Sequence, residues 1–425
     1  MSRLAIRGGR VLDPLTGAEQ MADVFIESGQ ILALGTAPAE YHAEQTIEAA
    51  GCVIVPGLVD LAVRLREPGY EHKGTLRTEL LAAVAGGVTA IACPPDTDPP
   101  LDEPGLVEML KYRARQSNLA QVYPLGALTA KLGGERLTEM AELSDAGCVA
   151  FSQADAPIND TQVLYRALQY AATFGYRIWL RAQDAYLARN GVAHEGNIAT
   201  RLGLPGIPAV AETIALDRIL RLVRITGAQV HLCRLSTAEA VAMVRAAKAE
   251  GLPITADVSA LHLHLCEADI GYFDPMMHLV PPLRTSHDRA ALREGVASGV
   301  IDAICSDHRP LDADEKQMPF GEAVPGASGV ELLLALTLRW GRESNLPLAQ
   351  VIERVTAGPA RVLDPRLGRM AIGERADLCV FDPAAEFVVT AEWLRSQGKN
   401  TPLLGQTLQG RIRATVVAGA LAYRA

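Results

Sequence analysis

Short apolar runs alternate with amphipathic stretches through the middle of the chain, from residue 56 to residue 365. Eight runs have the length and composition of buried strands: Val53–Leu65, Val88–Cys93, Gln121–Leu128, Cys148–Ser152, Arg177–Arg181, Gln229–Leu235, Ile254–Ser259 and Ile301–Ser306. Helical periodicity marks the stretches between them, such as Thr75–Ala85, Leu106–Gln116, Asp160–Phe174, Ala211–Ile225 and Thr237–Ala249. Gly175 and Gly251 follow two of these stretches, where glycine caps a helix without a steric penalty. Eight βα units predict an α/β fold with a TIM-like (β/α)8 barrel.

An open, doubly wound parallel sheet is the alternative for this alternation. In its nucleotide-binding form, that fold carries a glycine-rich phosphate loop after the first strand. The segment after Val53–Leu65 is Arg66-Glu-Pro-Gly69, which is no such loop. The pattern therefore favours the barrel, over residues 56–365.

The two ends of the chain share another pattern, of short alternating strands separated by turn residues. At the N-terminal end these are Leu4–Ile6, Arg10–Leu12, Asp23–Glu27, Gln30–Gly35 and Gln45–Glu48. At the C-terminal end they are Asp377–Asp382, Ile412–Val417 and Leu421–Tyr423. Residues 1–55 and 366–425 are therefore expected to pair into one composite β-sandwich that brings the termini together.

Composition narrows the classes of partner. The 425 residues carry a net charge of −9, 49% of them are apolar, and Lys and Arg form no run. Nucleic acid is therefore not an expected partner, and no apolar stretch reaches the ~18 residues of a membrane span. Seven cysteines are scattered without a CxxC pair, which predicts reduced thiols in a cytoplasmic protein.

Catalytic residues of such a barrel lie at the C-terminal ends of its strands, and several segments there and beyond form a recognisable series. They are Pro56-Gly-Leu-Val-Asp60, Leu65-Arg-Glu-Pro-Gly69, Pro281-Pro-Leu-Arg284, Asp307-His308, Gly326-Ala-Ser-Gly-Val-Glu331, Thr356–Arg361 and Gly373-Glu-Arg-Ala-Asp377. In this order they resemble the type I dihydroorotases of the amidohydrolase superfamily, over essentially the whole chain.

The resemblance implies a zinc site at the barrel mouth and reversible closure of carbamoyl-aspartate to dihydroorotate. Five of the six positions that are chemically essential in the family hold other residues here. Ala62 and Arg64 replace the His-x-His after the first strand, and Gln153 replaces an acidic ligand after the fourth. Arg181 and Arg234 replace histidines after the fifth and sixth strands, and only the strand-eight aspartate, Asp307, remains.

The substituted residues do not suit zinc, which takes imidazole, thiolate or carboxylate ligands. Alanine offers no donor atom, and arginine stays protonated and offers only N–H groups. We therefore predict no metal and no other cofactor. Without a metal, Asp307 as a lone general base would supply only about 10²–10⁴-fold acceleration, so it is expected to be vestigial.

Substrate binding is also altered relative to the family. Arg66 matches an arginine that grips the substrate carboxylate, but the asparagine that usually assists it is Asp96 here. A carboxylate at that position would repel an anionic substrate. Another family asparagine, before the Pro-Pro-Leu-Arg segment, is Val280.

The new arginines have two interpretations. Arg64, Arg181 and Arg234 either form an anion pocket with Arg66 or fill the vacated metal volume and pair with Asp307 and neighbouring carboxylates. The second is favoured, because buried cations need partners. His262 and His264 have the i, i+2 spacing of metal ligands, but they follow the seventh strand and the family histidine that His262 matches is not a ligand.

Three functions remain. The favoured one is a non-catalytic dihydroorotase-like subunit, because inactive chains of this kind assemble with the aspartate transcarbamoylase catalytic chain in some bacteria; this implies a hetero-oligomer or homo-oligomer. The second is an active dihydroorotase, or a related zinc cyclic amidase, with an atypical metal site. The third is an anion-sensing module that uses the arginine cluster.

Overall fold

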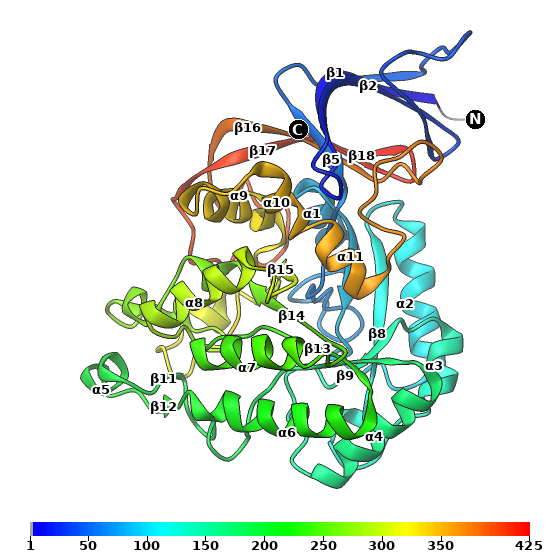
Figure 1. The fold of residues 1–425 in the computed structure, drawn as a ribbon. Coiled ribbons are helices and arrows are strands. Elements are labelled where there is room, and N and C mark those ends of the chain that lie inside the picture. The colour runs from blue at the N-terminus through cyan, green and yellow to red at the C-terminus, as the bar shows by residue number, and fades with distance from the viewer. Residues whose placement is uncertain (1–2) are drawn as a thin grey trace.

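The computed structural model describes residues 3–425, and its centre is a nearly closed barrel of eight parallel strands (Figure 1). In chain order, which is also their order in the sheet, the strands are β6 (Leu58–Asp60), β7 (Val88–Cys93), β8 (Gln121–Ala127), β9 (Ala150–Ser152), β10 (Arg177–Leu180), β13 (Gln229–Leu232), β14 (Ile254–Ser259) and β15 (Ala303–Cys305). A bridge between Val63 and His308 joins the segments that follow β6 and β15. The predicted (β/α)8 barrel is confirmed, and an open sheet is not the fold.

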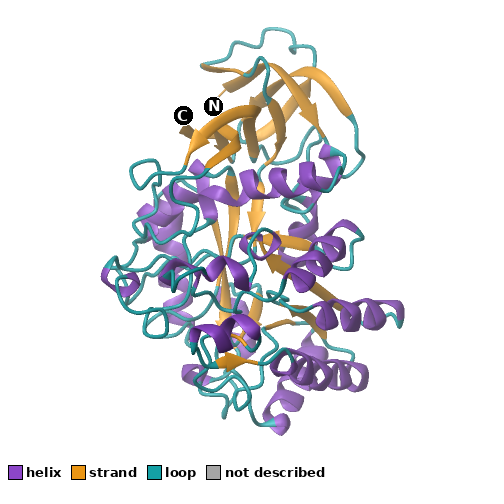
Figure 2. Ribbon diagram, turned by 90° about the vertical axis from the view of Figure 1, so that its left-hand side faces the viewer, coloured by secondary structure: helices purple, strands orange, loops and turns teal. Residues whose placement is uncertain are grey.

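Helices surround the barrel strands (Figure 2). The α-helices are α1 (Leu76–Ala85), α2 (Pro104–Gln116), α3 (Met140–Ala146), α4 (Thr161–Phe174), α5 (Asn197–Leu202), α6 (Val210–Thr226), α7 (Ala238–Ala249), α8 (Ser286–Ala297), α9 (Leu333–Glu343), α10 (Leu348–Glu353) and α11 (Ala357–Leu363). Side chains at their N-termini explain several starts, because Thr75, Asp160 and Thr237 each accept a hydrogen bond from a backbone N–H of the first turn. Gly175 ends α4 in the left-handed conformation, as the sequence predicted.

Smaller elements lie in the connections. Two short strands, β11 (Ala193–His194) and β12 (Gly206–Ile207), pair in parallel on either side of α5. The 3-10 helices are η1 (Ala130–Leu132), η2 (Ala260–Leu263), η3 (Glu267–Ile270), η4 (Pro275–Met277), η5 (Asp314–Lys316) and η6 (Val330–Leu332). In the described part of the chain, no helix has both the length and the apolar character needed to cross a bilayer.

The two ends of the chain meet in one further sheet, next to both termini in Figure 1. Its strands are β1 (Arg3–Leu12), β2 (Glu19–Glu27), β3 (Gln30–Leu34), β4 (Gln45–Glu48), β5 (Val53–Pro56), β16 (Leu378–Val388), β17 (Thr407–Val417) and β18 (Ala420–Arg424). Antiparallel pairing of β5 with β16 joins the N-terminal and C-terminal parts. The predicted pairing of the chain ends is confirmed, and hydrogen bonds link all eight strands into a single sheet.

One predicted strand is wrong in its extent. The run Val53–Leu65 is not a single strand, because β5 belongs to the sheet of the chain ends and β6 belongs to the barrel. Gly57 separates them where the backbone passes very close to β7, and a Cβ atom there would lie 2.1 Å from the Thr89 Oγ1 atom. Apolarity alone does not reveal this break, because both strands are buried.

Candidate functional site

The side chains singled out from the sequence gather at one end of the barrel. Parallel strands bring their C-terminal ends to the same mouth. The residues are Ala62, Arg64 and Arg66 after β6, Asp96 after β7, Gln153 after β9, Arg181 after β10, Arg234 after β13 and Asp307 after β15. Asp155 and Arg309 join them. The "mouth cluster" below means the charged network of Arg64, Arg181, Arg234, Arg309, Asp96, Asp155 and Asp307.

Asp155 is the centre of the mouth cluster. One of its carboxylate oxygens, Oδ1, accepts hydrogen bonds from Arg234 Nη2 at 2.7 Å and from Arg181 Nε at 3.0 Å. The other, Oδ2, accepts from Arg64 Nη2 at 2.8 Å and forms an ion pair with Arg309 Nη2 at 3.3 Å. One carboxylate therefore bridges four guanidinium groups from four different strand ends.

Arg64 and Arg234 extend the network to the other two carboxylates. Arg64 donates from Nε to Asp96 at 2.7 Å and from Nη1 to Asp307 at 3.2 Å, and its side chain is only 3% exposed. Arg234 donates from Nη1 to the same Asp307 oxygen at 2.9 Å. Asp307 is therefore bonded to two cations, the arrangement expected of a structural ion pair rather than a free base.

The charges of the mouth cluster nearly balance, with four guanidinium groups and three carboxylates. Burial alone would raise the pKa of Asp155, but Arg234, Arg64 and the other arginines hold that pKa well below its ordinary value. Burial likewise opposes ionisation of Asp96, and Arg64 reverses the effect and lowers its pKa. Burial would lower the pKa of Arg64, but Asp96 and Asp155 raise it. Asp155, Asp96 and Arg64 thus favour one another's charged forms away from bulk water.

The backbone at the mouth adopts the strained conformations that cluster at active sites. Ala154, Arg234 and Asp307 have φ angles of 50°, 55° and 49°, and Arg66 has 65°. For a residue other than glycine, this backbone conformation costs on the order of 1–3 kcal/mol, and the surrounding structure must hold the residue in it. At the mouth, these left-handed residues and the salt bridges of the side chains therefore occur together.

The remaining predicted residues are occupied elsewhere. Gln153 accepts a hydrogen bond from Thr129 Oγ1 at 2.9 Å and donates to the Leu132 carbonyl at 2.9 Å, so its amide fastens a neighbouring loop. Arg66 donates to the Pro310 carbonyl at 2.8 Å, and burial, with Arg309 and Arg64, lowers its pKa to about 10. Ala62 is buried and presents only a methyl group.

These residues do not fit a zinc ion. Three carboxylates are present, but each is already engaged by one or more guanidinium groups that would repel a divalent cation. Across residues 3–425, no group of three or more His, Cys, Asp or Glu side chains is arranged to hold a metal. The family resemblance implies a zinc site, but the residues at the mouth do not fit zinc, either by their identity in the sequence or by their arrangement in the structure.

The histidines near the barrel do not form an alternative site. His262 Nε2 lies 3.0 Å from the Pro281 carbonyl oxygen, whereas His264 Nε2 lies 2.9 Å from the Leu336 carbonyl oxygen. The two rings therefore contact different groups and do not face a common metal position. His231 bonds Thr255 and Asp257 inside the barrel. His308 contacts Glu79 at 2.8 Å and accepts from the Gly329 N–H, which is an architectural role.

Sequence reasoning did not single out Asp155 and Arg309. Both lie two residues beyond a predicted position, Asp155 after Gln153 and Arg309 after Asp307. The available signal was chemical: three buried arginines require more negative charge than Asp307 alone supplies. No pattern in the sequence shows which of several nearby carboxylates pairs with the buried arginines.

Two small cavities adjoin the mouth cluster. A cavity of about 10 Å³ touches Arg181 and Arg234, and a second of about 20 Å³ touches Gln153 and Arg181. The first is about the size of one water molecule, whereas small-molecule sites typically measure ~300–1,000 Å³. These two cavities would not admit a cyclic amide or a comparable organic anion.

Acid is expected to destabilise the protein through this network. The pKa values of Asp155 and Asp96 are depressed in the folded state, so around pH ~4 the unfolded chain binds more protons than the folded one. Their contribution is complete above about pH 5 and is lost as the pH falls through the folded pKa values. Burial raises the pKa of Asp60 to about 6 and that of Glu331 to about 7, and these two groups act in the opposite direction.

Denaturant unfolding at pH 7, 5, 4 and 3 measures the effect, and Asp96→Asn is the matched variant that separates the opposing groups. We expect the variant to be less stable than the wild type at pH 7 but to lose less stability on acidification. Parallel curves for the two proteins would show that Asp96 is not ionised by Arg64 in the way the geometry indicates.

Solved structures share this barrel together with its added sheet. The L-hydantoinase (dihydropyrimidinase) from Arthrobacter aurescens superposes with a TM-score of 0.88 at 23% identity, over 100% of this chain and 96% of that one. A D-hydantoinase structure gives a TM-score of 0.82 at 23% identity, over 99% and 95%. These likenesses establish the fold.

Sequence comparison gives the particular family. A model described as Dihydro-orotase-like matches residues 51–240, and one described as Amidohydrolase family matches residues 193–423. A "Dihydroorotase-like protein" from Pseudomonas aeruginosa is 46% identical, over 99% of both chains. A "Dihydroorotase" from Syntrophotalea carbinolica is 40% identical, also over 99% of both. The chain belongs to the dihydroorotase-like proteins of the amidohydrolase superfamily, as its motifs indicated.

Proposed function

We propose that this chain is a non-catalytic dihydroorotase-like subunit that supports the assembly of aspartate transcarbamoylase in pyrimidine biosynthesis. One observation carries the proposal: three guanidinium groups stand at positions that hold zinc ligands in the resembled family, and carboxylates of the mouth bind them. Each guanidinium offers hydrogen-bond donors where the chemistry of the family needs electron-pair donors.

The chemistry explains why such a site would not hydrolyse a cyclic amide. In the family, the metal lowers the pKa of bound water and polarises the amide carbonyl. The arginines cannot take up a proton from water, because a guanidinium stays protonated. Asp307 would remain as the only family group for proton transfer, and two arginines bind it. These features support a site retained for folding.

The partner rests on the resemblance to inactive dihydroorotase-like chains that assemble with aspartate transcarbamoylase. The relative from P. aeruginosa, whose printed name is "Dihydroorotase-like protein", is similar over 99% of both chains. A complete barrel and an intact sheet at the chain ends suit a subunit whose surface, rather than its mouth, is functional.

Elemental analysis of the purified chain, with a dihydroorotase assay on the same sample, tests the non-catalytic part. We expect zinc well below one ion per chain and no turnover above the uncatalysed rate. The competing hypothesis is an active enzyme with an atypical metal site, in keeping with the relatives whose printed name is "Dihydroorotase". Chelator-sensitive turnover with one or two zinc ions per chain would establish that hypothesis instead.

Deletion of the gene, with size-exclusion analysis of transcarbamoylase activity in the lysate, tests the structural part. We expect the high-mass transcarbamoylase peak to disappear and to return when the chain is supplied in trans. An Arg64→His, Arg234→His chain that folds should restore the peak equally well if the mouth has no catalytic part in assembly. An unchanged peak in the deletion strain would refute the partner.

A further inference from the structure

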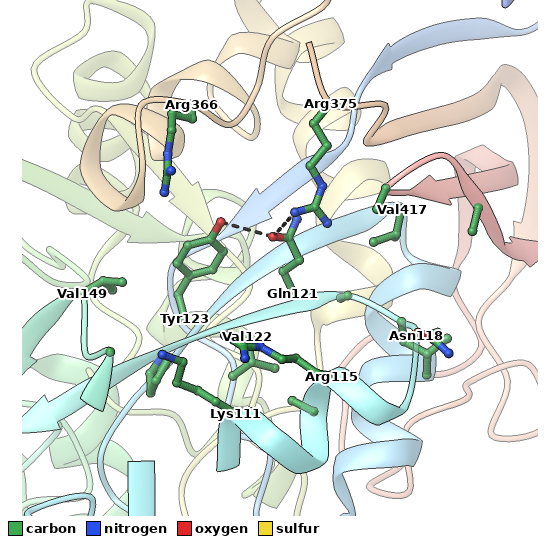
Figure 3. Close-up of a pocket in the computed structure, with 17 residues that line it drawn as sticks. Lys111, Arg115, Asn118, Gln121, Val122, Tyr123, Val149, Arg366, Arg375 and Val417 are labelled. Carbon is green, nitrogen blue, oxygen red and sulfur yellow. Dashed lines mark hydrogen bonds between the residues drawn. The ribbon is translucent and has the colours of Figure 1, made fainter. Parts of the chain in front are cut away.

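A second site, far from the mouth cluster, lies where the N-terminal end of β8 meets the sheet of the chain ends (Figure 3). It is a cavity of about 810 Å³, bounded by the last turns of α2, the first residues of β8, the segment before β16 and the turn between β17 and β18. That volume falls within the range of small-molecule sites, ~300–1,000 Å³. We refer to it as the basal pocket.

Four cations from two different segments converge on the basal pocket. Lys111 and Arg115 come from α2, one helical turn apart, and Arg366 and Arg375 come from the segment that precedes β16 (Figure 3). Two carboxylates answer two of them: Asp364 pairs with Arg366 at 2.7 Å and Asp377 with Arg375 at 3.0 Å. Within residues 3–425, neither Lys111 nor Arg115 has an acidic partner. The pocket thus keeps an excess of positive charge in a protein whose net charge is −9.

Two of the cations, Lys111 and Arg375, are held by hydrogen bonds and retain unused donors. Lys111 Nζ donates to the Ala146 carbonyl at 3.0 Å and lies where a side chain on Gly147 would collide with it, so the glycine leaves room for the ammonium group. Arg375 Nη1 donates to Gln121 Oε1 at 2.6 Å, and the Tyr123 hydroxyl approaches the same oxygen at 3.4 Å. These contacts fix two cations and a hydroxyl around one space while leaving further N–H groups to bind a ligand.

The dipole of α2 explains only one of these four cations. Basic residues in the last turn of a helix complement its dipole, which accounts for Arg115 on α2. It does not account for Arg366 and Arg375, which come from a separate segment and face the same space. Convergence of cations from separate segments on one cavity is the arrangement by which proteins bind phosphate groups.

Much of the rest of the lining of the basal pocket is apolar, which indicates that a ligand would have an apolar or planar part as well as negative charge. Leu119, Val122, Val149 and Val417 line the pocket together with the Tyr123 ring. An inorganic ion would leave most of this apolar surface and of the 810 Å³ unused. We propose that the basal pocket binds an organic phosphate of nucleotide size, with its phosphates on Lys111 and Arg115 and its apolar or planar part against the valines. This site is independent of the mouth cluster and of the proposed structural function.

Isothermal titration of the full chain tests the proposal, with ATP in EDTA, tripolyphosphate and adenosine as three separate probes. We expect ATP to bind saturably at one site per chain, tripolyphosphate to bind more weakly and adenosine to give no saturable signal at the same concentrations. Arg115→Glu should weaken ATP binding by at least about tenfold, because it removes a charged donor and adds repulsion. Arg115 is exposed and unpaired, so the variant is expected to fold.

The control is Arg136→Glu, which makes the same change of charge at an exposed residue that does not line the pocket. Equal weakening by the two variants would mean general attraction to a polyanion and would overturn the assignment. No saturable ATP binding to the wild type, or ATP binding that Arg115→Glu leaves unchanged, would also overturn it. Tripolyphosphate binding as tightly as ATP would overturn the role given to the apolar wall. A transcarbamoylase assembly defect would concern the proposed function, not this site.

Discussion

Replacing Asp155 by asparagine is expected to lower the free energy of unfolding by about 3–5 kcal/mol, the usual cost of breaking a buried ion pair from one side. Asparagine keeps the shape of the side chain but removes the charge that four arginines share. Those arginines would be left with Asp96 and Asp307 alone. Urea unfolding followed by circular dichroism measures the loss, and Asp217→Asn is the control. Asp217 pairs with Arg221 on an exposed helix face, where such pairs contribute about 0–1 kcal/mol.

The arginines of the network should not be equivalent. Arg309 makes a single ion pair among the described residues, a 3.3 Å contact with Asp155. Arg234 makes two shorter contacts, at 2.7 and 2.9 Å, with different aspartates. Arg309→Met should therefore cost less stability than Arg234→Met. The outcome that would contradict the network is an Asp155→Asn chain as stable as the wild type.

Restoring the family's ligands is expected to make stability depend on zinc. The variant Ala62→His, Arg64→His, Gln153→Asp, Arg181→His, Arg234→His removes three guanidinium groups and adds imidazole and carboxylate donors at the barrel mouth. Without metal, Asp155 and Asp96 would lose most of their cationic partners, and the variant should be several kcal/mol less stable, by about the cost of broken buried pairs. With zinc, binding to the folded state alone adds RT ln(1 + [Zn]/Kd), about 2.7 kcal/mol at a hundredfold excess over Kd.

Thermal unfolding with and without zinc, together with elemental analysis, separates the outcomes. The wild type should show no zinc-dependent shift, because its site offers no free donor set, and the restored variant should show a clear one. A wild-type chain that binds zinc at the mouth and is stabilised by it would contradict the geometry of the guanidinium groups. A restored variant that folds but ignores zinc would show that the backbone at the mouth no longer holds ligand geometry.

The sequence predicted the barrel because each βα unit carries its own local signals. Strand runs, helical periodicity and caps such as Thr237 are encoded within a few residues, and the structure reproduces them closely. The pairing of the chain ends was predictable from their shared strand pattern. The break at Gly57 was not, because it depends on the backbone's approach to Thr89 in β7.

For the candidate site too, some features follow from the sequence and others only from the tertiary structure. That Ala62, Arg64, Arg181 and Arg234 cannot ligate zinc follows from the identity of the side chains, so the sequence alone determines it. Which carboxylate binds the arginines depends on distances across four strand ends, and only the tertiary structure decided that Asp155 does so and that Arg309 contributes. The basal pocket likewise arises only when α2 and the segment before β16, more than two hundred residues apart in the chain, fold against one another. Charge identity is local, whereas the partner of each charge is decided by packing.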